Sequence, residues 1–135
     1  MEPGGRFREP FPILYADDVQ GLRDFYCTGF GFEARYQYPT DGPPEYAFLR
    51  LDPLGIGLVD RHAAASILAR SLEAPDQPGF ELCITSDDVD AACERLAALG
   101  VPILVQPANR PWGERLAYAQ DPEGNPIQII GPLRP

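Results

Sequence analysis

The sequence predicts an α+β fold made of two tandem βαβββ modules in one domain. Two short words recur along the chain at nearly the same spacing. Asp17-Asp-Val19 returns 70 residues later as Asp87-Asp-Val89, and Asp52-Pro-Leu-Gly55 returns 69 residues later as Asp121-Pro-Glu-Gly124. The apolar segments around these words follow the same order in both halves, which indicates a duplicated unit of about half the chain.

The chain of 135 residues has the length of one domain, and a core of this size needs no disulfide or metal to stabilise it. We expect a single domain over residues 1–135, with module one at about 8–61, an inter-module segment at about 62–78 and module two at about 79–133. The Ala and Leu content of 62–74 predicts a short helix, which the linker from Pro75 to Pro78 ends.

Module one is predicted to be a strand, a helix and three strands. Residues 11–15 form a short apolar strand, and Asp17 and Asp18 then offer an N-cap for a helix that Gly29 and Gly31 end. The apolar positions of this helix repeat at helical spacing: Val19, Leu22, Phe25 and Tyr26. The other strands are expected at 32–38, 46–51 and 56–60, with a loop at 39–44 and a type I turn at 52–55.

Module two repeats this order of elements. A strand at 80–85 precedes a helix that Asp87 or Asp88 caps and Gly100 ends. The apolar positions of this helix are Val89, Ala92, Cys93, Leu96 and Leu99. The remaining segments are a strand at 101–105, a loop at 107–113 and two strands at 116–120 and 126–130 around the second Asp-Pro-x-Gly word.

The composition excludes several kinds of site. Twenty acidic residues against eleven basic ones give a formal net charge of -9, and every basic residue is Arg. The absence of Lys excludes Schiff-base and P-loop chemistry. The single His62 excludes a metal centre built on two or three His of one chain. The acid excess argues against a nucleic-acid partner and favours a cationic small molecule.

Cysteine usage and the termini indicate the compartment. Cys27, Cys83 and Cys93 are an odd number without metal-binding spacing, and we expect them to be reduced, buried thiols. The N-terminus lacks the apolar core of a signal peptide, and no segment approaches the ~20 apolar residues of a membrane span. We therefore expect a cytoplasmic protein with no membrane partner. The all-Arg usage with abundant Ala, Pro and Gly indicates a GC-rich bacterial genome.

Five motifs span almost the whole chain. They are Asp18-Val-x5-Phe25-Tyr26, Gly31-Phe32, Asp87-Asp-Val89, Pro111-Trp112-Gly113 and Asp121-Pro-Glu-Gly-Asn-Pro126. In this order and spacing the chain resembles the vicinal oxygen chelate superfamily, which includes glyoxalase, extradiol dioxygenase and bleomycin-resistance proteins. The stretch from Pro12 to Val19 and the Pro-Trp-Gly motif are most similar to the bleomycin-resistance branch. The resemblance implies mixed sheets that form a cup with the helices outside, and a homodimer with two ligand sites.

The resemblance also implies where a metal would be held. Family enzymes place one ligand, a His, Gln or Glu, on the first strand and one on the last strand of each module. Counted from the helix starts, the first-strand positions are Phe11 and Glu81; counted from the Asp-Pro-x-Gly turns, the last-strand positions are Val59 and Gln128. Because Phe11 and Val59 have no lone pair, the set is too small for Zn²⁺, Ni²⁺ or Fe²⁺. We predict no cofactor; a divalent metal would need a shifted register or a ligand from a partner chain.

The expected site is a metal-free pocket lined by aromatic and carboxylate side chains. Strand alternation turns Ile13, Cys83 and Ile130 inward together with the positions just named. The repeat turns Tyr118 away from the cup whereas its size argues the opposite, so its facing stays open. The predicted ligand-binding residues are Trp112, Glu81, Gln128, Phe48, Tyr46, Phe11, Tyr15 and Val59.

Two of these residues have a second interpretation. Trp112, in the loop before the last hairpin, either contacts a ligand or covers the core edge or a dimer contact. Glu81 either acts as a ligand-binding or catalytic carboxylate or pairs with Arg50 or Arg115. His62, at the start of the inter-module segment, is interpreted as a surface residue.

We expect a metal-independent binding protein that sequesters an aromatic or cationic compound of the antibiotic type, as the resemblance to bleomycin-resistance proteins implies. No residue is predicted to be catalytic under this hypothesis. The alternative is a lyase, isomerase or dioxygenase of the same superfamily with an atypical site in which Glu81 acts as the base. A third possibility is a structural or regulatory module that kept only the fold.

Overall fold

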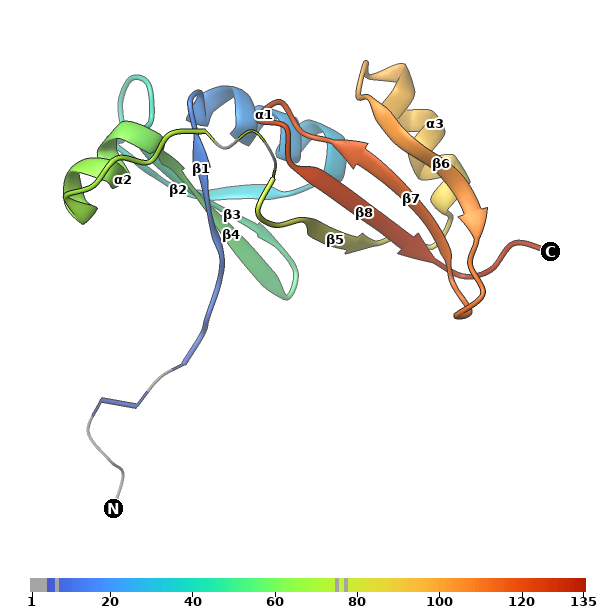
Figure 1. The fold of residues 1–135 in the computed structure, drawn as a ribbon. Coiled ribbons are helices and arrows are strands. Elements are labelled where there is room, and N and C mark those ends of the chain that lie inside the picture. The colour runs from blue at the N-terminus through green and yellow to red at the C-terminus, as the bar shows by residue number, and fades with distance from the viewer. Residues whose placement is uncertain (1–4, 7, 75, 77) are drawn as a thin grey trace.

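The structure is a computed structural model that describes residues 5–6, 8–74, 76 and 78–135. Pro75 and Gln77, on which part of the predicted linker falls, lie outside the described residues. Eleven helices and strands follow one another in the described residues (Figure 1): β1 (Ile13–Ala16), α1 (Val19–Phe30), β2 (Glu33–Tyr38), β3 (Tyr46–Leu51), β4 (Leu54–Asp60), α2 (Arg61–Leu68), β5 (Leu82–Thr85), α3 (Val89–Ala98), β6 (Ile103–Asn109), β7 (Arg115–Gln120) and β8 (Pro126–Gly131).

Two four-stranded mixed sheets confirm the predicted α+β fold of two βαβββ units. Sheet one has the order β1-β4-β3-β2 and sheet two the order β5-β8-β7-β6. In each sheet the first strand pairs with the last in parallel, and the other pairs are antiparallel. Helix α1 packs on sheet one and helix α3 on sheet two, and both helices lie on the upper side of their sheets in Figure 1. We call the opposite face of each sheet, which neither helix covers, its open face.

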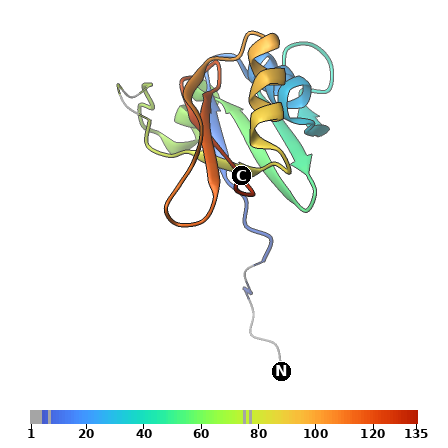
Figure 2. The same ribbon diagram turned by 90° about the vertical axis from the view of Figure 1, so that its right-hand side faces the viewer.

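Alternation along the strands separates the core from the open faces. In β1, Leu14 is 2% exposed whereas Ile13 is 49% exposed. The same alternation buries Ala47 and Leu49 in β3, and Ala117 and Ala119 in β7. These buried residues meet α1 and α3 in one core that both modules share. The view along the molecule in Figure 2 shows helix α3 in front of this layer of strands.

Aspartate side chains cap the two long helices as predicted. Asp18 accepts a 3.0 Å hydrogen bond from the Gly21 amide, and Asp88 accepts one of 3.1 Å from the Ala91 amide. Helix α1 ends at Gly31, whose φ of 79° favours glycine. The prediction that Gly29 also ends this helix is wrong, because Gly29 is a buried residue within it.

Gly29 has a packing role instead. A methyl group at this position would lie 3.4 Å from the Leu96 side chain of α3, so the missing side chain lets the two helices approach each other. The Gly29 carbonyl also accepts a 2.7 Å hydrogen bond from Nη2 of Arg95 on α3. These contacts join the two modules along their helices.

The two Asp-Pro-x-Gly words form different turns. In module one, Leu51 pairs with Leu54, so the loop is Asp52-Pro53, with a cis peptide bond between these residues. The predicted type I turn is therefore wrong here, since a cis proline at the third position defines a type VI turn. In module two, the Asp121 amide donates to the Asn125 carbonyl at 3.0 Å, and the loop is one residue longer, with Gly124 at a φ of 85°.

Several predicted boundaries shift by a few residues. Strand β4 begins at Leu54 rather than at residue 56 because the tighter turn lets pairing start earlier. Strand β6 runs to Asn109 and occupies part of the predicted loop at 107–113. The short inter-module helix is α2, which the Asp60 side chain caps through the Ala63 amide at 3.0 Å. No helix in the described part of the chain is long and apolar enough to cross a membrane.

Candidate functional site

Three polar side chains form a hydrogen-bonded trio on the open face of sheet two: Glu81, Tyr118 and Gln128. The Tyr118 hydroxyl donates to Glu81 Oε1 at 2.9 Å. Gln128 Nε2 donates to the same carboxylate oxygen at 2.7 Å and to the Tyr118 hydroxyl at 2.7 Å. The structure thus brings together Glu81 and Gln128, which the sequence placed on the same face, and adds Tyr118, whose facing was left open.

The strand register explains why these residues meet. Tyr118 of β7 and Gln128 of β8 are paired residues, and Gln128 also pairs with Cys83 of β5. Glu81 precedes Cys83 by two residues, so it continues the same face. Burial raises the pKa of the Tyr118 phenol, and its hydrogen bond to Glu81 raises it further. Tyr118 is therefore a neutral donor beside the Glu81 carboxylate at physiological pH.

Cys83 lies beside the trio and is exposed, so the prediction of three buried thiols is wrong for this residue. Its thiol donates to Gln128 Oε1 at 3.8 Å. Burial of the sulfur raises the Cys83 pKa, and the carboxylates of Glu114 and Glu81 raise it further. The thiol is thus mainly protonated at neutral pH and a poor nucleophile. Cys93 is buried in the core, and Cys27 is half-buried.

Module one carries an apolar counterpart of the trio. Ile13 of β1 is equivalent to Cys83 of β5, 70 residues later, and Ile13 pairs with Gly57 as Cys83 pairs with Gln128. Gly57 in turn pairs with Phe48. The ring of Phe11, two residues before Ile13, packs edge-on against Phe48 with centroids 5.0 Å apart. Phe11, Phe48 and Gly57 therefore take the places of Glu81, Tyr118 and Gln128.

This register corrects one predicted equivalence. Val59, which the turn word aligned with Gln128, pairs with Tyr15 and Tyr46, one strand repeat beyond Gly57. The cause is the extra residue in the second turn, since the same word closes a shorter loop in module one. It also explains Tyr118: Phe48 corresponds to Tyr118 at a spacing of 70, whereas the spacing of 69 in the turn words points to Ala117, which is buried in the core.

Glycines on β4 let aromatic rings lie against the open face of sheet one. A methyl group at Gly55 would meet Cζ of Phe48 at a distance shorter than any real contact, and one at Gly57 would lie 3.0 Å from the Tyr46 hydroxyl. The rings of Phe48 and Tyr46 thus cover the backbone of β4. Tyr36 of β2 extends this surface, with its ring centroid 6.0 Å from that of Tyr46. We call Phe11, Tyr36, Tyr46 and Phe48 the aromatic floor.

The donor set does not fit the metal that the family resemblance implies. Of the four equivalent positions, Phe11 and Gly57 offer no side-chain ligand. At the other two, Gln128 turns its amide nitrogen, not its oxygen, toward Glu81. No group of three His, Cys, Asp or Glu side chains that could hold a metal occurs among the described residues. A single Glu carboxylate does not meet the three or four protein ligands of a zinc or iron site.

Glu81 does not pair with either arginine considered from the sequence. Arg50 lies 4.0 Å from Asp52, and Arg115 forms a two-pronged ion pair with Asp90. The partners of Glu81 are the neutral donors of the trio. Trp112 is 65% exposed, so it does not cover the core, and its indole Nε1 donates to Glu114 Oε1 at 2.8 Å. His62 lies exposed on α2, as expected.

A cavity of about 430 Å³ lies where the two modules meet. One wall is the β3–β4 hairpin, including Leu54 and Gly55, and the other is strand β5 from Leu82 to Thr85. Cys83 lines this cavity and also touches the trio. The space therefore offers apolar walls next to a polar edge, as small-molecule sites commonly do.

Sequence reasoning missed Gly57 and Tyr36. The alternation of Gly55 and Gly57 with larger residues in β4 was visible, but it was interpreted only as part of a hairpin. Tyr36 shares a face with Tyr38 in the predicted strand at 32–38, and a bulge between Ala34 and Tyr36 sets that face. No pattern in the sequence announces this bulge.

Paired βαβββ units whose equivalent strand positions meet on open faces define a class of ligand-binding and metal-binding folds. The model of the Glyoxalase/Bleomycin resistance protein/Dioxygenase superfamily matches residues 10–129, and the chain belongs to this superfamily. Among curated proteins, it is 29% identical over 120 residues to the uncharacterized protein YraH of Bacillus subtilis, with 86% of this chain and 91% of YraH covered.

Two further relatives support this assignment. The chain is 26% identical over 143 residues to a lactoylglutathione lyase of Pseudomonas putida, covering 89% of this chain and 82% of that protein. The crystal structure of a glyoxalase/bleomycin resistance protein/dioxygenase from Nocardioides superposes with a TM-score of 0.78 at 22% identity, covering 98% of this chain and 87% of that one. The latter likeness shows the fold alone.

Proposed function

We propose that this chain is a metal-independent binding protein that sequesters a small aromatic or cationic molecule, in the manner of a bleomycin-resistance protein. The observation that carries the proposal is the edge-on pair of Phe11 and Phe48 at positions equivalent to Glu81 and Tyr118. Where a metal enzyme of this family would hold ligands in module one, this chain presents hydrocarbon. Aromatic rings stack favourably on such a surface.

The charge of the chain supports a cationic ligand. The net charge of -9 attracts cations over a distance of about 10 Å at moderate salt, and the attraction weakens as salt rises. Some of these acids cap helices, as Asp18, Asp60 and Asp88 do. The local part of the argument therefore depends on Glu81.

We also propose that the functional unit is a cytoplasmic homodimer. Five large apolar side chains on or beside the open faces are exposed: Phe11, Ile13, Tyr15, Tyr36 and Trp112. Apolar surface of this kind is commonly covered by a partner or a ligand, and a second copy would place one open face against another. Sedimentation velocity at micromolar protein concentration should give a dimer; a monomer at every concentration would contradict the proposal.

A fluorescence titration tests the binding function. Trp112 is the single tryptophan, and it is exposed beside Glu114, so bleomycin and other cationic aromatic antibiotics should quench or shift its emission. Phe48→Leu should weaken binding at least fivefold because it removes a ring of the floor. Ile67→Ala, on the exposed side of α2, is the matched control and should bind normally. Absence of quenching by any compound, with no protection of cells, would favour a structural or regulatory module.

The trio supports a second candidate, a lyase, isomerase or dioxygenase with Glu81 as the base. A carboxylate held by Tyr118 and Gln128 is positioned to take a proton from a substrate, and one relative is named lactoylglutathione lyase. Turnover of lactoylglutathione, assayed with and without added divalent metal, tests this candidate. Elemental analysis adds to it: about one tightly bound transition metal per subunit, lost in Glu81→Ala, would overturn the metal-independent binding function.

A further inference from the structure

The hydrogen bonds of the trio leave one acceptor for a ligand. Both Nε2 protons of Gln128 and the Tyr118 hydroxyl proton are donated within the trio. All three bonds end on Glu81 Oε1 or on the Tyr118 oxygen, and no described residue donates to Glu81 Oε2. The trio therefore has no free donor for an anion, and its free acceptor is a carboxylate oxygen.

No arginine neutralises this part of the open face. Glu81 and Glu114 form no ion pair within the described residues, while Arg50 and Arg115 pair with Asp52 and Asp90. Both carboxylates act on Cys83, whose thiol lies between the trio and the inter-module cavity, and no cationic group contributes to the shift of its pKa. A carboxylate with only neutral partners gains from a cation.

An aromatic ring completes the surroundings. The Trp112 indole donates to Glu114 Oε1 at 2.8 Å and is 65% exposed, so its face is available to a ligand. Carboxylates next to an indole are the groups that hold organic ammonium ions, which gain from both the charge and the ring.

From this geometry we infer that the surface around Cys83, between Glu81 and Glu114, is a subsite for a protonated amine of the ligand. This inference rests on the proposed binding function and narrows its ligand class to aromatic ammonium compounds. The amine would donate to Glu81 Oε2, while Tyr118 and Gln128 act as positioning residues that hold Oε1. An aromatic carboxylate of the same shape would be rejected, because it would meet acceptors only.

Cys83 allows the charge of the subsite to be measured without a ligand. Methanethiosulfonate reagents carrying a 2-ammonioethyl or a 2-sulfonatoethyl group react with a thiolate, which displaces methanesulfinate and forms a mixed disulfide. Peptide mass spectrometry then gives the modification rate of Cys83 with each reagent, and the ratio of rates cancels the thiolate fraction. At low salt we expect Cys83 to favour the cationic reagent about tenfold, with the half-buried Cys27 as the internal reference.

Charge-removing variants sharpen this measurement. Glu81→Gln and Glu114→Gln should each lower the ratio, and the double variant should bring it near the value for Cys27. Glu94→Gln removes an exposed carboxylate from helix α3 and is the matched control, which should leave the ratio unchanged. A double variant that keeps the wild-type ratio would overturn the inference, provided its thermal unfolding is that of wild type.

Ligand protection tests the amine itself. Phenethylamine should slow the reaction of Cys83 with N-ethylmaleimide, 2-phenylethanol should do so at least fivefold less effectively, and phenylacetate should not protect. If 2-phenylethanol protects as well as phenethylamine, ring binding stands but the amine subsite is overturned. If no probe protects while the reagent ratio persists, the aromatic-binding function fails for these rings and the ammonium subsite keeps its support.

Discussion

The hydroxyl of Tyr26 donates a 2.7 Å hydrogen bond to Oδ2 of Asp121, which links helix α1 of module one to the β7–β8 turn of module two. Tyr26 is fully buried, and Asp121 is 3% exposed. Asp121 also accepts from the amides of Glu123 and Asn125 and from the Asn125 side chain. One carboxyl group therefore organises the turn and joins the two modules.

Replacing Tyr26 by Phe should destabilise the protein by about 1–2 kcal/mol, because the buried carboxyl loses one donor while the ring still fills its place. Chemical denaturation should show a lower midpoint with an unchanged slope. Tyr36→Phe changes an exposed tyrosine and is the control, with an effect expected within about 0.5 kcal/mol. A Tyr26→Phe variant as stable as wild type would show that the link between modules does not depend on this bond.

The same tyrosine predicts a loss of stability in alkaline solution. Burial raises the pKa of Tyr26 well above its usual value of 10.0, and the adjacent Asp121 carboxyl raises it further. Below pH 10 the phenol is neutral in both the folded and the unfolded chain, so its contribution to stability is fully present. As pH rises above 10, the unfolded chain releases the proton first, and the free energy of unfolding falls. Thermal melts from pH 8 to 11 should show this fall, reduced in Tyr26→Phe.

The fold could be predicted because its signals are local. Asp18 and Asp88 cap their helices, and alternation along the strands separates core from open face, as predicted. The exceptions involve contacts between modules: Gly29 continues helix α1 because it packs against Leu96. A glycine that ends a helix and one that admits a neighbouring helix look the same in the sequence.

The candidate site was predictable in part. The helix starts place Phe11 and Glu81 correctly at a spacing of 70, since no insertion separates each from its helix. The last strands lie beyond turns of different length, so the identical turn words misalign Val59 with Gln128. Tyr118 and Gly57 enter the site through this one-residue difference, which only the strand pairing reveals.

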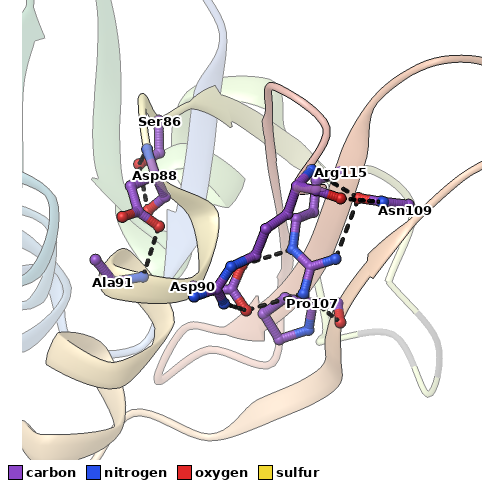
Figure 3. A network of polar contacts seen from close by, with 8 residues as sticks. Ser86, Asp88, Asp90, Ala91, Pro107, Asn109 and Arg115 are labelled. Atoms are coloured by element: carbon purple, nitrogen blue, oxygen red, sulfur yellow. Dashed lines mark hydrogen bonds and ion pairs between the residues drawn. The ribbon is translucent and has the colours of Figure 1, made fainter.

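The ion pair between Asp90 and Arg115 predicts a loss of stability in acid. Asp90, in the first turn of α3, receives two bonds from the Arg115 guanidinium of β7, which also donates to Asn109 and Pro107 (Figure 3). The hydrogen bond from Arg115 lowers the pKa of Asp90 below its usual 3.8, despite an opposing effect of burial.

Because the folded chain holds Asp90 ionised more firmly than the unfolded chain does, this contribution to stability is present above about pH 4 and is lost as pH falls below that value. Urea unfolding at pH 7 and pH 3 should therefore show a smaller pH difference for Asp90→Asn than for wild type. Asp24→Asn, on an exposed acid of helix α1, is the control and should keep the wild-type difference. An equal pH difference in Asp90→Asn would contradict the assigned role.

Gly55 should tolerate no side chain beneath the aromatic floor. A methyl group there would overlap Cζ of Phe48 and approach the Leu49 carbonyl oxygen to 2.9 Å, so either the ring or the strand must move. We expect Gly55→Ala to cost about 1–3 kcal/mol as an overpacking change and to weaken binding of aromatic ligands by tilting Phe48 away from Phe11. Gly79→Ala, where nothing lies within 4 Å, is the matched control and should change neither quantity. If Gly55→Ala kept wild-type stability and affinity, Phe48 would be free to move, and the floor would not be the rigid surface that the binding proposal requires.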